Sequence, residues 1–312
     1  MKKMLRCSLL IVLIAGCMYI AVGCDFRAQW ELADGTLSIA SEAGMTAWMK
    51  YRATQAGEDA CGTVHTVIIG DGVAAIPPEA FAACCNLESV TMADSVAEIG
   101  ERAFYQDGAL VSVTWPDGLR RIGESAFQET GLEEVVLPEA VEEVGLWAFD
   151  GMARLKYVAL RDRLTSVEYA FSRCPALQSV SLGDGLTRLG DYEFSDCTGL
   201  KELYLPENVV ALGEHPLLES GVKRLIVGGS LQSIDRLVIT RANYPSLQQL
   251  VFLQGPPPVG TDGSGGFCWA MDEAAAEEIT VFYLESQAPL WAEWSACPAV
   301  CIESMEDLPP LK

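Results

Sequence analysis

Apolar residues return at nearly constant intervals through most of the chain. Between residues 64 and 247, nine segments each begin with an aliphatic residue, and their starts lie 22, 23 or 25 residues apart. The starts are Val64, Leu87, Leu110, Leu132, Leu155, Leu177, Leu200, Val222 and Leu247. Each start is followed three and five residues later by further apolar residues, such as Val90 and Met92 after Leu87. Alternation over so few residues predicts one short β-strand in every segment.

The second part of each repeat has fixed positions of its own. An aliphatic–glycine pair recurs, as in Ile99-Gly100, and this glycine is expected to adopt a positive φ that a side chain would disfavour. Most repeats then close with a phenylalanine. These residues are Phe81, Phe104, Phe127, Phe149, Phe171 and Phe194. A single repeat cannot bury its own apolar set, so the pattern predicts a solenoid in which stacked repeats share one core.

The pattern weakens toward the C-terminus. Leu217 stands where earlier repeats have phenylalanine, and it follows His215-Pro216. The last repeat contains Gly255 and three prolines, followed by a Gly- and Ser-rich stretch at 260–266. The stack from residue 213 onward is therefore expected to be irregular.

The repeat L-x-x-V-x-[LV]-P-x-x-[LV]-x-x-I-G-x-x-A-F, clearest in Leu87–Phe104 and Leu132–Phe149, resembles the BspA-like class of leucine-rich repeats. Trp30–Ile39, with its Asp-Gly turn, resembles the opening hairpin of that family, and residues 279–294 resemble its closing strand and short helix. The resemblance implies a leucine-rich-repeat solenoid with one parallel sheet of about nine short strands, irregular or short-helical opposite walls, and a cap at each end. Family members are mostly envelope proteins and adhesins that contact host matrix proteins, other cells or host receptors.

The N-terminus is typical of an export signal. Three basic residues precede an apolar run, Ser8–Val22, that is too short and interrupted for a confident membrane span. Cys17 and Cys24 each follow small residues in a pattern that resembles the lipobox of bacterial lipoproteins. Cys24 is the favoured lipidation site because polar sequence starts directly at Asp25. Cys17 is the alternative because Ile14 fits the usual pattern, and an ordinary secretory signal remains a third interpretation.

These features divide the chain into four parts. Residues 1–23 are interpreted as a lipoprotein signal peptide and residues 24–63 as an N-terminal cap. Residues 64–254 hold the repeats, and residues 255–312 hold the irregular last repeat and a C-terminal cap.

The charge of the chain narrows the classes of molecule that it is expected to bind. The formal net charge is −22, from 21 Lys+Arg against 43 Asp+Glu. Removal of residues 1–23 takes away 3 basic and no acidic residues, which leaves a net charge of −25. Nucleic acids and anionic lipid surfaces both require an excess of Lys and Arg, so neither is an expected partner. Any membrane attachment is expected through the lipid anchor only.

The chain contains eleven cysteines. Cys84, Cys174 and Cys197 lie three residues after a closing phenylalanine, and this fixed position predicts small, buried, inert thiols. Cys297 and Cys301 are either a disulfide or free thiols. A metal site there is disfavoured because no histidine is close in sequence.

Enzymatic chemistry has little support in the sequence. The two histidines, His65 and His215, have no nucleophile in register, and no phosphate-binding or nucleophile-elbow motif is present. We therefore expect no catalytic residue, no metal and no cofactor.

A protein or glycoprotein ligand is the expected partner, and it would bind the outward side of the strands. The candidate residues on this face are Ile68, Thr91, Thr114, Val136, Tyr157, Tyr204, Arg224 and Ile226. Tyrosine is common at interface hot spots, although β-branched residues also occupy strands for their conformational preference alone. Two functions are open: a surface-exposed adhesin-like binding module, or a scaffolding lipoprotein that faces the periplasm, which Asp25 next to Cys24 favours.

Overall fold

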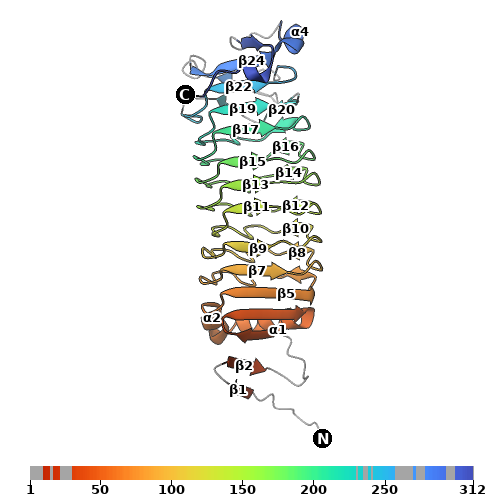
Figure 1. Ribbon diagram of the computed structural model, residues 1–312, viewed down its shortest axis with the longest axis vertical. Coiled ribbons are helices and arrows are strands. Elements are labelled where there is room, and N and C mark those ends of the chain that lie inside the picture. Colours follow the sequence, from red (N-terminus) through yellow and green to blue (C-terminus); the bar gives the residue numbers. More distant parts are fainter. Residues whose placement is uncertain are drawn as a thin grey trace, which may run out of the picture.

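The strands predicted from the repeat pattern form one wall of a tall solenoid (Figure 1). The computed structural model describes residues 10–14, 17–21, 30–229, 231–234, 238–239, 242–256, 270–271, 278–292 and 299–311. The strands of this wall are β5 (Thr66–Gly72), β7 (Ser89–Met92), β9 (Ser112–Thr114), β11 (Glu134–Val136), β13 (Tyr157–Ala159), β15 (Ser179–Ser181), β17 (Glu202–Leu205), β19 (Arg224–Val227) and β22 (Gln249–Phe252). They form three parallel sections, β5 to β9, β11 to β15 and β17 to β22, and within each section equivalent repeat positions are aligned, for example Val67 with Val90. The fold class and the strand positions are confirmed.

A second line of two-residue strands runs along the adjacent wall. Its members are β6 (Ala75–Ile76), β8 (Glu98–Ile99), β10 (Arg121–Ile122), β12 (Glu143–Val144), β14 (Ser166–Val167), β16 (Arg188–Leu189), β18 (Ala211–Leu212) and β20 (Ser233–Ile234). They also pair in parallel, in two sections of four strands. The aliphatic residue of each aliphatic–glycine pair thus belongs to this second ladder, a regular element on a wall that the family resemblance implied to be irregular or short-helical.

The glycines of the repeat are required by close packing and not by a positive φ. Gly100 and Gly123 do not have a positive φ, so that expectation was wrong. A Cβ atom on Gly100 would lie 2.6 Å from the Pro78 nitrogen, and one on Gly123 would lie 2.6 Å from the Glu101 nitrogen. The positive φ values occur two residues later in the repeat, for example at Trp147. The chain therefore turns its corner at that later position, and glycine lets the turns approach each other.

The closing phenylalanines form a continuous stack inside the solenoid. All six side chains are fully buried, and the ring centroids of successive residues lie 5.0–6.1 Å apart. Trp48 extends the stack at the N-terminal end, with its ring centroid 6.2 Å from that of Phe81. At the other end Leu217 takes the next position and borders a void of about 10 Å³. The ladder therefore ends where the sequence loses its phenylalanine.

The N-terminal cap closes the bottom of the stack. Strands β3 (Trp30–Ala33) and β4 (Thr36–Ser41) form the predicted antiparallel hairpin, and β4 then pairs in parallel with β5. Helices α1 (Glu42–Arg52) and α2 (Gln55–Cys61) follow. Trp48 of α1 donates a hydrogen bond to the Ala80 carbonyl oxygen at 3.0 Å, and this contact fixes the helix on the first repeat.

The C-terminal cap continues the sheet. Strand β24 (Thr280–Leu284) pairs with β22, and β25 (Ala299–Ile302) pairs with β24. The 3₁₀ helix η1 (Glu285–Gln287) and helix α4 (Ala288–Trp291) follow β24, and η2 (Met305–Asp307) follows β25. The short strands β21 (Val238–Ile239) and β23 (Ala270–Met271) pair in parallel beside this end.

Residues of the proposed export signal form a separate hairpin. Strands β1 (Leu10–Ile14) and β2 (Cys17–Ala21) pair antiparallel. Within the described residues, no helix has the length and apolar character needed to cross a membrane.

Cys84 is bonded to Cys61, so the expectation that it is a free thiol was wrong. Their Cα atoms lie 4.9 Å apart and the two residues are separated by 23 positions. Cys61 and Cys84 each lie three residues before a repeat start, so successive turns place them side by side. Cys174 and Cys197 are buried free thiols, as predicted, and burial raises the pKa of Cys174. Cys301 is exposed, and Cys297 lies outside the described residues.

Candidate functional site

The outward strand face is open along the N-terminal and central repeats. Ile68, Thr91 and Thr114 are exposed, and Val136 on the next strand is partly exposed. Tyr204 continues this column at 45% exposure. The parallel register aligns Ile68, Thr91 and Thr114, and Val136 and Tyr204 take the equivalent position in later repeats. The structure thus brings six of the eight predicted face residues onto one accessible face, with Tyr157 in the neighbouring column.

Hydroxyl groups dominate this open surface. Ser89, Ser112 and Ser179 occupy the column on the N-terminal side of the strands, next to the threonines of the central column. The Thr66 and Ser89 hydroxyl groups are 3.1 Å apart and hydrogen-bonded across two strands. Tyr157, at 36% exposure, is the large aromatic residue in the same column. The surface therefore offers short polar groups and protruding tyrosine rings, and neither column contains lysine.

The C-terminal part of the same face is covered by the chain itself. Ile226, Val251 and Phe282 point outward from β19, β22 and β24, yet each is at most 5% exposed. Together with Ile302 they form a second apolar cluster, and Leu308 packs against it. The segment after β25 returns along the face, and the C-terminus lies beside β19 and β22 (Figure 1). The expected exposure of Ile226 was wrong because this tail covers it.

Arg224 holds the tail in place. Its Nη2 atom donates a hydrogen bond to the Pro309 carbonyl oxygen at 2.8 Å, and Gln249 donates to the same oxygen at 3.0 Å. Arg224 also donates to Glu202 at 2.8 Å, and its side chain is 16% exposed. The predicted basic residue of the face is therefore engaged within the chain.

Ser304 orders the start of the tail. Its hydroxyl group accepts a hydrogen bond from the Glu306 amide at 3.2 Å, and its own amide donates to Asp307 at 2.8 Å. This capping box fixes η2 and directs Leu308 toward the apolar cluster. Sequence inspection missed this segment because so short a tail has no repeat period.

Two buried acids lie inside the stack, away from the strand face. Asp107 is fully buried without a hydrogen bond of ordinary geometry, and burial raises its pKa to about 8. The Cys84 backbone and the Arg52 guanidinium act on this pKa in the opposite direction. Glu193 is also fully buried, and burial raises its pKa well above the usual range. Both positions are closed to solvent, so they affect stability and not surface chemistry.

The histidines lie apart from each other. His65 is exposed, with its Nδ1 atom 3.8 Å from a Glu88 carboxylate oxygen. His215 is in contact with Tyr192 and Tyr244, with ring centroids 5.9 and 6.4 Å away.

Stacked parallel strands with aligned apolar positions define a leucine-rich-repeat solenoid, a class of protein-interaction module that is typically not enzymatic. A family model described as the BspA-type leucine-rich repeat region matches residues 59–169 and 120–244, with 6 copies. The chain belongs to this family. No curated protein matches it significantly.

Several solved bacterial structures are similar to this chain. A leucine-rich repeat protein from Bacteroides ovatus is 17% identical, covers 97% of this chain and 100% of its own, and has a TM-score of 0.43. The Treponema pallidum leucine-rich repeat protein is 24% identical over 55% of this chain and 87% of its own, with a TM-score of 0.36. A leucine-rich cell surface protein from Faecalibacterium prausnitzii is 16% identical over 94% and 99%, with a TM-score of 0.34.

Proposed function

We propose that this protein is an exported, lipid-anchored binding module that holds a protein or glycoprotein with the open part of its strand face, as an adhesin does. The observation that carries the proposal is the exposure of Ile68, Tyr157 and Tyr204 on a face that the chain's own tail leaves free. Exposed aliphatic and aromatic side chains in a row are characteristic of interaction surfaces.

The open residues refine the proposed interface. Ile68, Thr91, Thr114, Val136, Tyr157 and Tyr204 remain candidate contacts. Arg224 and Ile226 are not proposed as contacts while the tail is docked, because Pro309 and Leu308 occupy them. The partner is expected to present hydrogen-bonding groups to the serine and threonine hydroxyls and an apolar side chain to the tyrosines.

A pull-down with residues 25–312 against host and envelope extracts tests this interface. The variant Tyr157→Ala with Tyr204→Ala should lose a partner that the unchanged protein retains. The control, Glu142→Ala with Glu143→Ala, alters two exposed residues at the second strand ladder, away from the strand face, and should retain the partner. Equal retention by both variants, at equal stability, would refute the strand-face assignment.

Export is supported by the Cys61–Cys84 disulfide. Disulfides persist in oxidising compartments outside the cytosol and are rare within it. A lipid on Cys24 would then retain the strongly acidic chain at a membrane, because two acyl chains are sufficient for stable anchoring. Cys24 lies outside the described residues, and the alternative Cys17 begins β2.

Metabolic labelling with a radioactive fatty acid tests the anchor. Cys24→Ser should abolish labelling and release the protein from membranes, whereas loss in Cys17→Ser alone would move the site to Cys17. Labelling that persists in the double variant would exclude lipidation at both positions.

A scaffolding lipoprotein that faces the periplasm is the second candidate function. Asp25 next to Cys24 favours it, because an acidic residue there retains lipoproteins at the inner membrane in some sorting systems. Proteolysis of intact cells separates the two: degradation supports the surface location, and protection supports the periplasmic one.

A further inference from the structure

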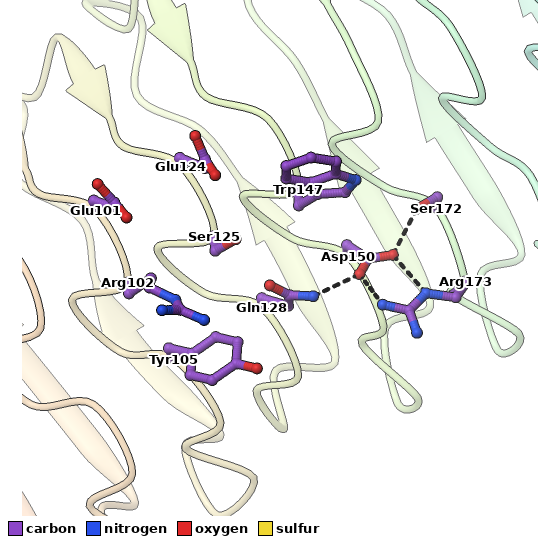
Figure 2. Close-up of a pocket in the computed structure, with 10 residues that line it drawn as sticks. All are labelled: Glu101, Arg102, Tyr105, Glu124, Ser125, Gln128, Trp147, Asp150, Ser172 and Arg173. Carbon is purple, nitrogen blue, oxygen red and sulfur yellow. Dashed lines mark hydrogen bonds and ion pairs between the residues drawn. The ribbon is translucent and has the colours of Figure 1, made fainter.

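A polar pocket lies at the corners that directly follow the glycines of the second strand ladder, such as Gly100 and Gly123, away from the strand face. It has a volume of about 640 Å³, within the range of small-molecule sites. Figure 2 shows Ser125 and Gln128 between the Arg102–Tyr105 pair and Trp147, with Asp150 and Arg173 at the far side. None of these residues belongs to the proposed protein-binding face.

A gap in a column of large side chains creates the pocket. The positive-φ corner holds a bulky residue in most turns: Arg102, Trp147, Tyr169, Tyr192 and His215. Ser125 occupies the turn between Arg102 and Trp147 and is buried. Turns are about 4.8 Å apart, so Arg102 and Trp147 are separated by about 10 Å across the serine. A flat ring with van der Waals contacts on both sides needs about 7–8 Å, so one ring fits this gap.

Trp147 offers an aromatic surface at the edge of this gap. Its indole is 38% exposed, and on the C-terminal side it packs on Tyr169 with the ring centroids 5.8 Å apart. Tyr169 in turn stacks on Tyr192 at 5.4 Å. Tyr169 and Tyr192 thus support one side of Trp147, while the small Ser125 leaves the other side of the indole without a bulky neighbour in the column.

The far side of the pocket is a fixed hydrogen-bonding wall. Asp150, whose side chain is 1% exposed, accepts hydrogen bonds from Gln128 at 2.8 Å, from Ser172 at 2.5 Å, and from two nitrogens of Arg173. Asp150 therefore holds the Arg173 guanidinium in one orientation. Arg102 is oriented similarly, with its guanidinium carbon 4.6 Å from the centre of the Tyr105 ring.

The charges in the pocket select against charged ligands. Glu101 and Glu124 line it as exposed carboxylates, and Asp150 is neutralised by Arg173, so an anion meets two carboxylates. A cation meets Arg102 and Arg173 at the two ends. A neutral ring with several hydroxyl groups satisfies both sets: hydroxyls donate to the carboxylates and accept from the guanidinium groups.

We propose that this pocket binds a neutral saccharide unit, with Trp147 as the stacking surface and the two arginines and two glutamates as its hydrogen-bonding partners. The site is independent of the strand face, so the protein holds a glycan and a polypeptide on different walls. A glycoprotein or an envelope polysaccharide supplies the same ring chemistry.

Saturation-transfer NMR on the purified protein tests the proposal with methyl α-glucopyranoside, methyl β-galactopyranoside and N-acetylglucosamine. Glucuronate and choline serve as anionic and cationic probes. At least one neutral sugar should bind at millimolar concentration, and the charged probes should bind more weakly. Binding of a charged probe alone, or of none of the five compounds, would overturn the proposal.

Three variants locate the site. Trp147→Ala should weaken sugar binding about tenfold, the usual contribution of one aromatic contact. Ser125→Trp should abolish binding by filling the gap, and it should fold, because Trp147 already occupies the equivalent corner at φ 55°. Tyr192→Ala, in the same column but outside the pocket, is the control and should bind normally. Sugar binding that survives Ser125→Trp in a folded protein, or is lost equally in Tyr192→Ala, would refute this pocket. Retention of a protein partner by Ser125→Trp would show that the strand-face function is separate.

Discussion

The same repeat positions are exposed to solvent at one end of the strand face and covered by the chain's own tail at the other. Along β5 to β17 the outward column presents Ile68, Thr91 and Tyr204 to solvent, whereas along β19 to β24 it presents Ile226 and others to the chain's own tail. The open part has hydroxyl groups beside this column, and the covered part has Arg224 and Gln249, which bind the Pro309 carbonyl.

This difference shows how a solenoid defines where its binding face ends. An outward apolar cluster attracts the first segment that can bury it, and a tail tethered two strands away has a high effective concentration. The tail docks where side chains also satisfy its backbone carbonyl. The hydroxylated repeats lack an apolar cluster of that size, so they stay free for another molecule.

The inner ladder provides the largest expected effect. Phe104→Ala should lower the free energy of unfolding by about 3–5 kcal/mol, because Phe104 is fully buried between Phe81 and Phe127. Leu217→Ala, in the irregular part, should cost about 2–3 kcal/mol because fewer atoms are removed and a void is already present. Denaturant unfolding of both variants measures the difference. An unchanged midpoint for Phe104→Ala would contradict a stacked core.

The next effect depends on pH and lies within the regular repeats. Asp107 has a pKa of about 8 in the folded protein and about 4 in the unfolded chain, so folding takes up a proton between these values. The contribution of Asp107 to stability is fully present below about pH 4. It falls by about 1.4 kcal/mol per pH unit as pH rises through this window, or about 3 kcal/mol between pH 5 and pH 7.

Asp107→Asn should remove that part of the pH dependence, and the part that comes from Glu193 should remain. The exposed Asp117→Asn is the control and should keep the full slope. Denaturant unfolding at pH 5, 6 and 7 measures the slope of the free energy of unfolding against pH. Parallel curves for the unchanged protein and Asp107→Asn would show that Asp107 is ionised when folded. The free energy of unfolding would then have no pH dependence that comes from Asp107.

The tail contributes less to the free energy of unfolding, but it makes the difference between the covered and the open parts of the strand face. Leu308→Asp should lower the free energy of unfolding by about 1–2 kcal/mol and should release Ile226, Val251 and Phe282 to solvent. A dye that fluoresces on apolar surfaces should then bind. Met305→Asp, at an exposed position of the same tail, should do neither. If Leu308→Asp leaves dye binding unchanged, Leu308 does not keep the apolar cluster around Ile226 covered.

The smallest effect on stability is expected at the open face. Tyr157→Ala with Tyr204→Ala should change the free energy of unfolding by about 0.5 kcal/mol or less, because both side chains are exposed. Thermal unfolding measures it beside the binding assay. A large loss of stability would mean that these tyrosines stabilise the sheet and are not available to contact a partner.

The sequence alone determined the solenoid, its strand positions and its phenylalanine ladder. Each of these depends on a periodic pattern, and a period read from Leu87 or Phe104 fixes which residues share a wall and which share the core. The hairpin at Trp30 was equally readable, because Asp34-Gly35 specifies a tight turn locally.

Only the tertiary structure decided the features that join different turns. The Cys61–Cys84 bond, the close approach at Gly100 and the cover of Leu308 over Ile226 all depend on distances between residues far apart in sequence. The pocket at Ser125 likewise exists because its neighbours one turn above and below are large. Periodicity states which position a residue occupies in its own turn, but contacts between turns and with a non-repeating tail depend on shape and volume, which the folded chain alone sets.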